Sequence, residues 1–224
     1  MSQKRPLIAE LVERRSRNLA RIPRLEQTRR RLQTLDGSFH SLHGNGTVPR
    51  RAKHELLRYF PIALVAITEG HFKMLYRDLI DSGDPFLTNA TGFKDIRIDI
   101  STLLATSSRT ISVGEFIASQ LPHNNLAQIE AHLSMLLDQN FSAEFTKRLQ
   151  REDAIDGQTL FQTHLRQMVI DTFRERHVYC HELASRVLPR AYTVSTYIKV
   201  FRVFVELVEE HVAEFSNARN AQSL

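Results

Sequence analysis

RRAKHELLRYFPIALVAITEGHFKMLYRDLIDS, residues 50–82, predicts a long helix with apolar side chains on nearly every face. A helix with this pattern belongs in the middle of a bundle, because none of its faces is suited to water. Pro61 cannot donate a backbone hydrogen bond and is expected to bend the helix, while Glu69 interrupts the apolar residues. We therefore expect a central helix with one embedded carboxylate.

Helical periodicity continues through the rest of the chain. Residues 193–215 place seven apolar side chains on one face and are expected to close the bundle. Ser112, with Glu115 three residues later, forms a capping box that opens one of the shorter helices. Residues 96–100 alternate like a strand, but no second strand is near to pair with them, so we expect a helix there. The remaining helices are expected at 94–106, 113–121, 125–138, 142–151 and 159–188, with a loop at 83–93.

The first quarter of the chain is strongly basic. Residues 1–58 carry 14 Lys and Arg against 5 Asp and Glu, a net charge of +9, whereas the remainder carries 16 against 20, a net charge of −4.

Residues 7–35 predict an amphipathic helix with a stripe of arginines, which Pro23 kinks or splits, followed by a loop to about residue 49. Guanidinium groups suit bidentate contact with phosphate, so the basic segment 5–35 predicts contact with a polyanion, RNA first. The arginines expected to contact RNA are Arg21, Arg24, Arg30 and Arg31. The alternative is a solvated helix face or an acidic protein partner.

Composition limits the class of protein. The 224 residues are 42% hydrophobic and 25% charged, and glycine and proline are scarce, which favours one all-α domain (1–224) with its core at 50–215. We expect a helical bundle of long central helices with shorter accessory helices. No apolar run follows the basic start, and none approaches the roughly 18 residues of a membrane span, so we expect a cytoplasmic protein without membrane contact. Cys180 is the single cysteine, which excludes an internal disulfide.

One segment of the helix at 159–188 brings together groups suited to phosphodiester chemistry. In RHVYCH, residues 176–181, Arg176 and His181 are five residues apart, whereas His177 and His181 are four apart and share a helix face. Arginine clamps phosphate, and imidazole exchanges protons near neutral pH. RNA supplies its own nucleophile, the 2′-OH, so a base, an acid and a positive charge are sufficient. The spacing alone is weak evidence, because a chain with 24 Arg and 10 His contains one such pair by chance.

In this segment the chain resembles the HEPN superfamily of helical domains. The motif of that family is Arg, usually followed by a polar residue, with a His four to six residues after the Arg, and residues 176, 177 and 181 match it. The order of elements also matches over 50–215, with a long apolar helix containing an acidic residue, Glu69, before the motif and an amphipathic helix after it. Leu183 stands where the smaller HEPN proteins paired with nucleotidyltransferase antitoxins usually carry Tyr. The chain is therefore more similar to the free-standing toxin and phage-defence types.

The resemblance implies an endoribonuclease that uses no metal or other cofactor and acts as a homodimer, with two copies of the motif facing one cleft. Arg176 would bind the scissile phosphate, and His181 would act as general acid or base. His177 would orient the phosphate or assist proton transfer, and Glu69 would hold Arg176 or a histidine in place. The products would carry 2′,3′-cyclic phosphate and 5′-OH ends. Such a protein would be a toxin of a toxin–antitoxin or phage-defence system, with an antitoxin protein as a further partner.

Several residues of this segment have competing assignments. Arg174 is expected to contact RNA and would also share or take over the phosphate-binding role. His177 and His181, at four-residue spacing, would suit two ligands of a metal ion, although no third ligand is evident. Cys180 is either a thiolate nucleophile or, as we expect, a small buried apolar residue.

Two other classes of function remain open. A non-catalytic HEPN-like domain would use the basic first helix to bind RNA or a nucleotide as a regulator. A helical interaction protein, such as an immunity or antitoxin partner, would use Arg176 and His181 only to line a dimer surface. RNA cleavage in EDTA, salt-sensitive RNA binding without cleavage, and a stable complex with an unrelated chain are the three outcomes that distinguish these classes.

Overall fold

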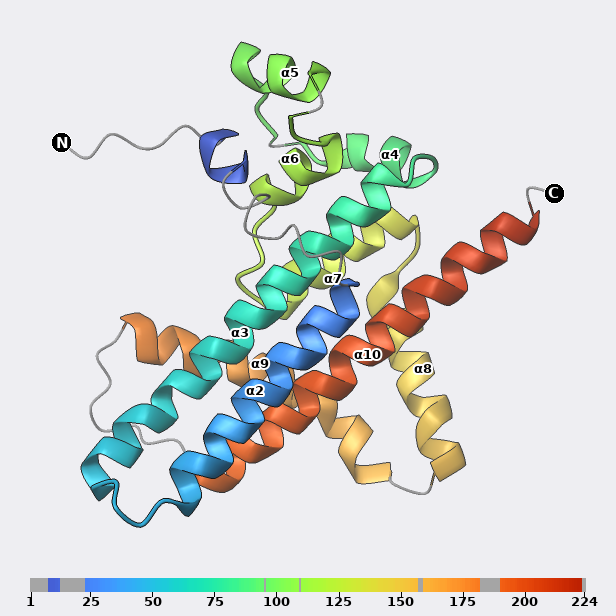
Figure 1. The fold of residues 1–224 in the computed structure, drawn as a ribbon. Coiled ribbons are helices and arrows are strands. Elements are labelled where there is room, and N and C mark those ends of the chain that lie inside the picture. The colour runs from blue at the N-terminus through green and yellow to red at the C-terminus, as the bar shows by residue number, and fades with distance from the viewer. Residues whose placement is uncertain are drawn as a thin grey trace.

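The computed structural model is an all-α helical bundle, as expected, and contains no strand in the residues that it describes (Figure 1). These residues are 8–12, 23–94, 96–108, 110–156, 159–181 and 190–222, with the side chains of 151–163 and 220–222 left undescribed. Arg21 and Leu183, which the sequence analysis singled out, lie outside them.

Three long helices run side by side and form the body of the bundle (Figure 1). They are α2 (Arg24–Gly44), α3 (Arg50–Asp81) and α10 (Ala191–Gln222). A fourth helix, α9 (Thr159–His181), packs against α3 and α10 and carries the 176–181 segment. Helix α3 contacts α2, α6, α9 and α10, so its expected position at the centre of the bundle is confirmed.

The shorter helices follow α3 along the chain, between α3 and α9. Their starts are fixed by local side-chain caps: the oxygens of Asp99, Ser112 and Asn125 each accept a hydrogen bond from the backbone N–H three residues later. The cap at Ser112 confirms the first half of the expected capping box, since its Oγ lies 3.0 Å from the N of Glu115. The short elements are α4 (Phe86–Asn89), the 3-10 turn η1 (Ala90–Gly92), α5 (Ile100–Ser107), α6 (Val113–Gln120), α7 (Leu126–Leu137) and α8 (Phe141–Asp156).

Several helix boundaries differ from the sequence expectation. Helix α2 continues to Gly44 through a segment expected to be a loop, because apolar residues at Leu35, Phe39 and Leu42 keep helical spacing and pack on the core. The expected loop at 83–93 contains α4 and η1, since Phe86 and Ala90 are buried and anchor that turn. Residues 96–99 are not helical, and α5 begins only after Asp99.

The core lies between α3, α8, α9 and α10 and is rich in aromatic rings. Phe72 of α3 contacts Tyr76 of the same helix and Phe204 of α10. Phe204 in turn contacts Phe145, which stacks on Phe141 in α8. All five side chains are less than 2% exposed. Rings of this size contribute large buried area and fix the spacing of α3, α8 and α10.

A network of charged side chains ties α2 to α3 and α10. The Arg24 guanidinium donates Nε and Nη2 to the two carboxylate oxygens of Glu209, at 2.6 and 2.7 Å, and Nη1 to Asp78. His71 is fully buried beside them, with Nδ1 2.9 Å from the Thr28 hydroxyl and Nε2 3.2 Å from Glu209 Oε1. The buried charges of Arg24 and Glu209 are thus paired and hydrogen-bonded, as burial requires.

Glycine is required where α6 meets the end of α3. The Gly114 N–H donates to Asp81 Oδ1 at 2.8 Å, and a Cβ at this position would overlap the backbone carbonyl oxygen of Arg77.

We expect Gly114→Ala to lower the free energy of unfolding by about 1–3 kcal/mol, because the two helices must separate to admit the methyl group. Urea denaturation measures the change. Gly37→Ala is the matched control, because a Cβ there meets nothing and should slightly stabilise α2. Equal stability of both variants would contradict this packing.

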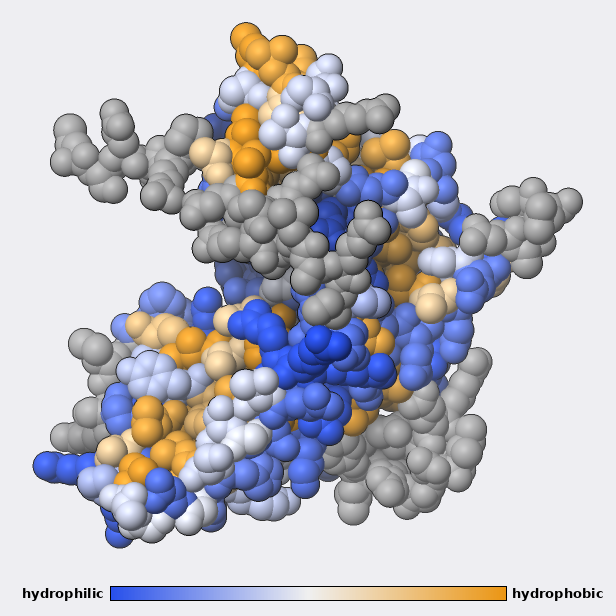
Figure 2. Space-filling model, in the orientation of Figure 1, coloured by the Kyte–Doolittle hydropathy of each residue, from blue (hydrophilic) through white to orange (hydrophobic). Residues whose placement is uncertain are grey.

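Apolar side chains gather on the surface at α5, seen as orange at the top of Figure 2. Ile98, Ile100, Leu103 and Leu104 are each more than 60% exposed. None of the described helices combines the length and the apolar character that crossing a membrane needs.

Candidate functional site

Arg176 lies in the C-terminal part of α9 and faces α3. Its Nη2 is 3.7 Å from Glu69 Oε1, and the two side chains are 25% and 23% exposed. At this distance the groups attract each other as an ion pair without a short hydrogen bond, so the guanidinium fork remains free to bind another anion. Glu69, the acidic residue embedded in α3, is therefore placed where it can orient Arg176.

His177 and His181 form an exposed pair at the last described turn of α9. Their ring centroids are 4.9 Å apart with an angle of 46° between the planes. The four-residue spacing places them on one helix face, as expected. Two imidazoles that reach solvent at the same turn are well placed to exchange protons with a bound molecule.

Arg176 and His181 do not meet within one chain. Five residues along a helix correspond to about 140° of rotation, so Arg176 faces α3 while His181 is exposed with His177. No interaction joins Arg176 to either histidine in the described part of the chain. In a single copy of the protein, the Arg176 guanidinium therefore points towards α3, whereas the imidazoles of His177 and His181 point towards solvent.

Arg174 lies on the same face of α9 as His177 and lines a shallow groove with it. The groove, of about 480 Å³, runs between α9 and the start of α7, where Asn124 and Asn125 provide amide groups. Arg166, also in the groove, is held by Glu130 through two hydrogen bonds of 2.9 and 2.7 Å. Arg174 is exposed, so it is the groove arginine available to an anionic ligand.

A carboxyl group that the sequence analysis missed lies directly before Arg176. Glu175 Oε1 accepts a hydrogen bond of 3.0 Å from the Tyr197 hydroxyl of α10, and burial raises the pKa of the carboxyl. Burial and the nearby Glu175 raise the pKa of Tyr179 to about 12. The i, i+4 spacing of Glu175 and Tyr179 was visible in the sequence, but the contact with Tyr197 depends on how α9 packs on α10.

The basic segment contributes less to an open surface than the sequence predicts. Arg24 was expected to contact RNA, but its side chain is 16% exposed and its guanidinium is occupied by Glu209 and Asp78. We therefore leave Arg24 out of any RNA-contacting surface. Arg30 is exposed and pairs with Glu26 of the same helix, while Arg31 lines a pocket between α2 and α3.

Cys180 is exposed, which corrects the expectation that it is a small buried residue. It follows Tyr179, whose side chain turns towards Glu175, so the next position on the helix points outwards. The pair His177 and His181 has no third histidine, cysteine or carboxylate beside it that would complete a metal site in the described residues.

Comparison of the chain with protein-family models, with curated proteins and with solved structures finds no match. The assignment of a function therefore rests on the residues and their arrangement.

Proposed function

We propose that this protein is a metal-independent endoribonuclease of the HEPN type. The observation that carries the proposal is the arrangement at the end of α9, where a half-buried Arg176 beside Glu69 adjoins two exposed imidazoles, His177 and His181. A fixed cation next to imidazoles that can pass protons to and from a bound molecule is what cleavage by the ribose 2′-OH needs from a protein.

The reaction uses the RNA as its own nucleophile. A histidine takes the proton of the 2′-OH, the 2′ oxygen attacks the adjacent phosphorus, and the P–O5′ bond breaks. A second proton donor protonates the departing 5′ oxygen. Arg176 binds the non-bridging oxygens and stabilises the extra negative charge of the transition state. The products are a 2′,3′-cyclic phosphate and a 5′-OH, and no water is consumed in this step.

The active form is a homodimer in this proposal. One chain directs Arg176 towards α3 and His181 outwards, about 140° apart around α9, so one copy does not enclose a phosphate between them. A two-fold axis beside the end of α9 brings the arginine of one protomer opposite the histidine of its partner, because an isologous contact places the same patch on both sides. His181 and Cys180 are exposed there and available for this contact.

The groove lined by Arg174 and His177 leads RNA to the motif. Arg174 supplies an exposed positive charge, and the amides of Asn124 and Asn125 supply hydrogen-bonding groups for sugar or base edges. Arg174 belongs to the RNA-binding surface in this assignment, and Arg176 belongs to the reacting centre.

Incubation of the full-length protein with single-stranded RNA in EDTA tests the proposal. We expect cleavage that needs no divalent ion and yields 3′ ends that resist labelling until the cyclic phosphate is opened and the resulting phosphate is removed. The control is an all-deoxy strand of the same sequence, which lacks the 2′-OH and should stay intact. An absence of RNA cleavage by dimeric protein, or cleavage of the deoxy strand at a similar rate, would overturn the assignment.

The biological role that accompanies this activity is that of a toxin in a toxin–antitoxin or phage-defence system. A free-standing ribonuclease is harmful to the cell that makes it unless it is restrained. Expression of the wild-type chain should therefore slow growth, and an antitoxin protein is the partner that would relieve it. Expression of a chain with Arg176 and His181 both replaced should leave growth unchanged.

A further inference from the structure

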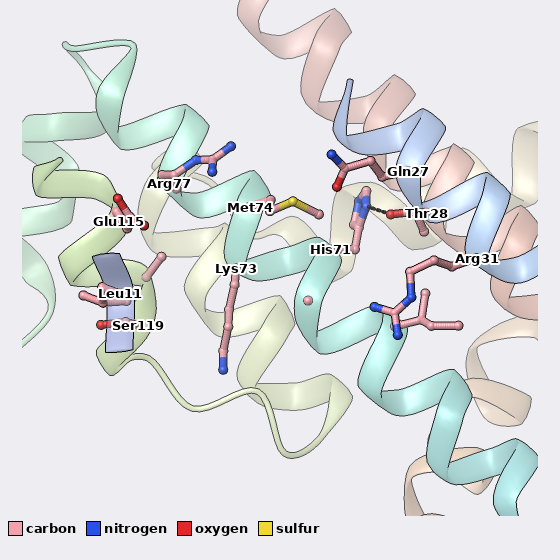
Figure 3. A pocket seen from close by; sticks show the side chains of 13 residues that line it. Leu11, Gln27, Thr28, Arg31, His71, Lys73, Met74, Arg77, Glu115 and Ser119 are labelled. Carbon is pink, nitrogen blue, oxygen red and sulfur yellow. Dashed lines mark hydrogen bonds between the residues drawn. The ribbon is translucent and has the colours of Figure 1, made fainter. Parts of the chain in front are cut away.

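A second candidate site lies where α3 meets α2 and α6. It is a trough of about 280 Å³ that crosses α3, with one wall from α2 and the other from α6 and residue 11 (Figure 3). Ile67, Gly70 and Met74 form part of its floor. Gly70 directly follows Glu69, so one turn of α3 serves both the trough and the Arg176 site.

The trough carries excess positive charge. Arg31 projects from α2, and Lys73 and Arg77 project from α3. Arg77 is paired with Asp78 at 2.6 Å, whereas no described carboxylate pairs with Arg31 or Lys73. Glu115 is the one acidic residue among the described residues that line the trough. Unpaired cations in a concave surface attract an anion, and an arginine fork suits phosphate.

Gly70 keeps the floor of this trough open. It lies in the interior of α3, where glycine costs about 1 kcal/mol relative to alanine. A Cβ at this position would meet nothing within 4 Å, so packing within the protein does not require glycine. Gly114 is the contrast, because there a neighbouring helix excludes any side chain. The missing side chain at Gly70 instead leaves space above the helix for a ligand.

The lining combines charge with apolar surface. Met74, Ile67 and Ala118 lie beside the cations, and a thioether makes favourable contacts with flat aromatic rings. Gln27, Ser119 and Glu115 supply donors and acceptors at the walls. The ligand that fits this lining has an anionic group and a flat, partly apolar body with polar edges, and its size is limited by a trough near the lower end of the range for small-molecule sites.

We propose that the trough binds one nucleoside phosphate, with the phosphate held by Arg31 and Lys73 and the base lying over Gly70 against Met74. This site is separate from the proposed reacting centre, and binding to it does not require RNA cleavage. The bound nucleotide is either a free mononucleotide or one unit of an RNA strand. Both carry the phosphate and the base that the trough would recognise.

Titration of the full-length protein tests the site. The probes are the four ribonucleoside monophosphates, tried one at a time, and a ten-nucleotide single-stranded RNA in which each 2′-OH is methylated so that it is not cut. We expect at least one probe to bind. Gly70→Leu should weaken binding about tenfold or more by filling the trough, and the double change Arg31→Gln with Lys73→Gln should do the same by removing the charge.

Matched variants separate occupation of the trough from loss of the fold. Gly37→Leu and Arg51→Gln change exposed helix positions outside the trough and should leave affinity unchanged. Gly70→Leu should melt at the same temperature as the wild type or higher, because it removes a glycine from a helix. If Gly70→Leu did unfold the chain, the Arg31 and Lys73 variant would still decide the question.

The two ligand sources give different outcomes. Binding of a monophosphate that Gly70→Leu abolishes identifies a free nucleotide as sufficient. If the RNA binds but no monophosphate does, and Gly70→Leu weakens that binding, the same site takes a nucleotide that is part of an RNA strand. The proposal is overturned if no probe binds, or if binding is equally strong in wild type, Gly70→Leu and the charge variant. None of these outcomes depends on whether the protein cleaves RNA.

Discussion

His181→Ala should lower the rate of RNA cleavage by about 10²- to 10⁴-fold, the contribution typical of a general acid or base. Arg176→Ala should lower it by about 10²- to 10³-fold, because the charge that develops on the phosphate loses its partner. Neither change should unfold the protein, since His181 is exposed and Arg176 makes one long ion pair with Glu69. Gel-resolved cleavage of an end-labelled RNA measures both rates.

His164→Ala is the matched control for His181→Ala. It removes an exposed histidine from the same helix, about 25 Å before His181, and should leave the rate unchanged. Arg176→Lys separates charge from geometry, because lysine keeps the charge but loses the bidentate fork and should remain well below the wild-type rate. Cleavage that survives both His181→Ala and Arg176→Ala would show that the reacting centre lies elsewhere.

Mixing the two inactive variants tests the dimeric arrangement. A heterodimer of Arg176→Ala with His181→Ala retains one arginine and one histidine on different protomers. If they act across the two-fold axis, co-expressed chains should recover a measurable fraction of the wild-type rate, while each variant alone stays inactive. No recovery in a verified heterodimer would mean that each chain supplies both groups itself.

Arg24→Ala should lower the free energy of unfolding by about 3 kcal/mol and the melting temperature by roughly 10 °C. The change removes the partner of a Glu209 carboxylate that is 13% exposed and leaves this charge without its two closest hydrogen bonds. Thermal and urea denaturation measure the effect. Arg29→Ala is the matched control, because Arg29 joins the same two helices through an exposed pair with Glu206 and should cost less than about 1 kcal/mol. Equal losses in both variants would contradict a special role of the buried pair.

The same network should stabilise the fold against acid. Burial alone would raise the pKa of Glu209, but hydrogen bonds from Arg24 and His71 outweigh it and lower the pKa to about 2. Because the folded pKa lies below the usual value near 4.5, this stabilisation is full above about pH 4.5 and disappears as the pH falls towards 2. In Arg24→Ala the difference in stability from wild type should therefore shrink between pH 5 and pH 2.

The sequence was informative wherever local rules dominate. The apolar pattern of residues 50–82 predicted the central helix because a buried helix leaves no polar face. Ser112 predicted the start of α6 because a cap needs only the next three residues. Residues 96–99 were misassigned as helix, since a short alternating segment carries too little periodicity to distinguish helix from extended chain.

The amino-acid sequence by itself determined the helical class, the placement of the Arg176, His177 and His181 segment on a helix, and the angle between those side chains, because helix geometry follows from spacing along the chain. Only the tertiary structure decided which partners the charged groups take. Arg24 is separated by 185 positions from Glu209, and no local pattern distinguishes it from Arg30, which remains exposed. The pairing of Glu69 with Arg176 and the open floor at Gly70 likewise depend on which helices lie beside α3, and that choice is made by packing of the buried core.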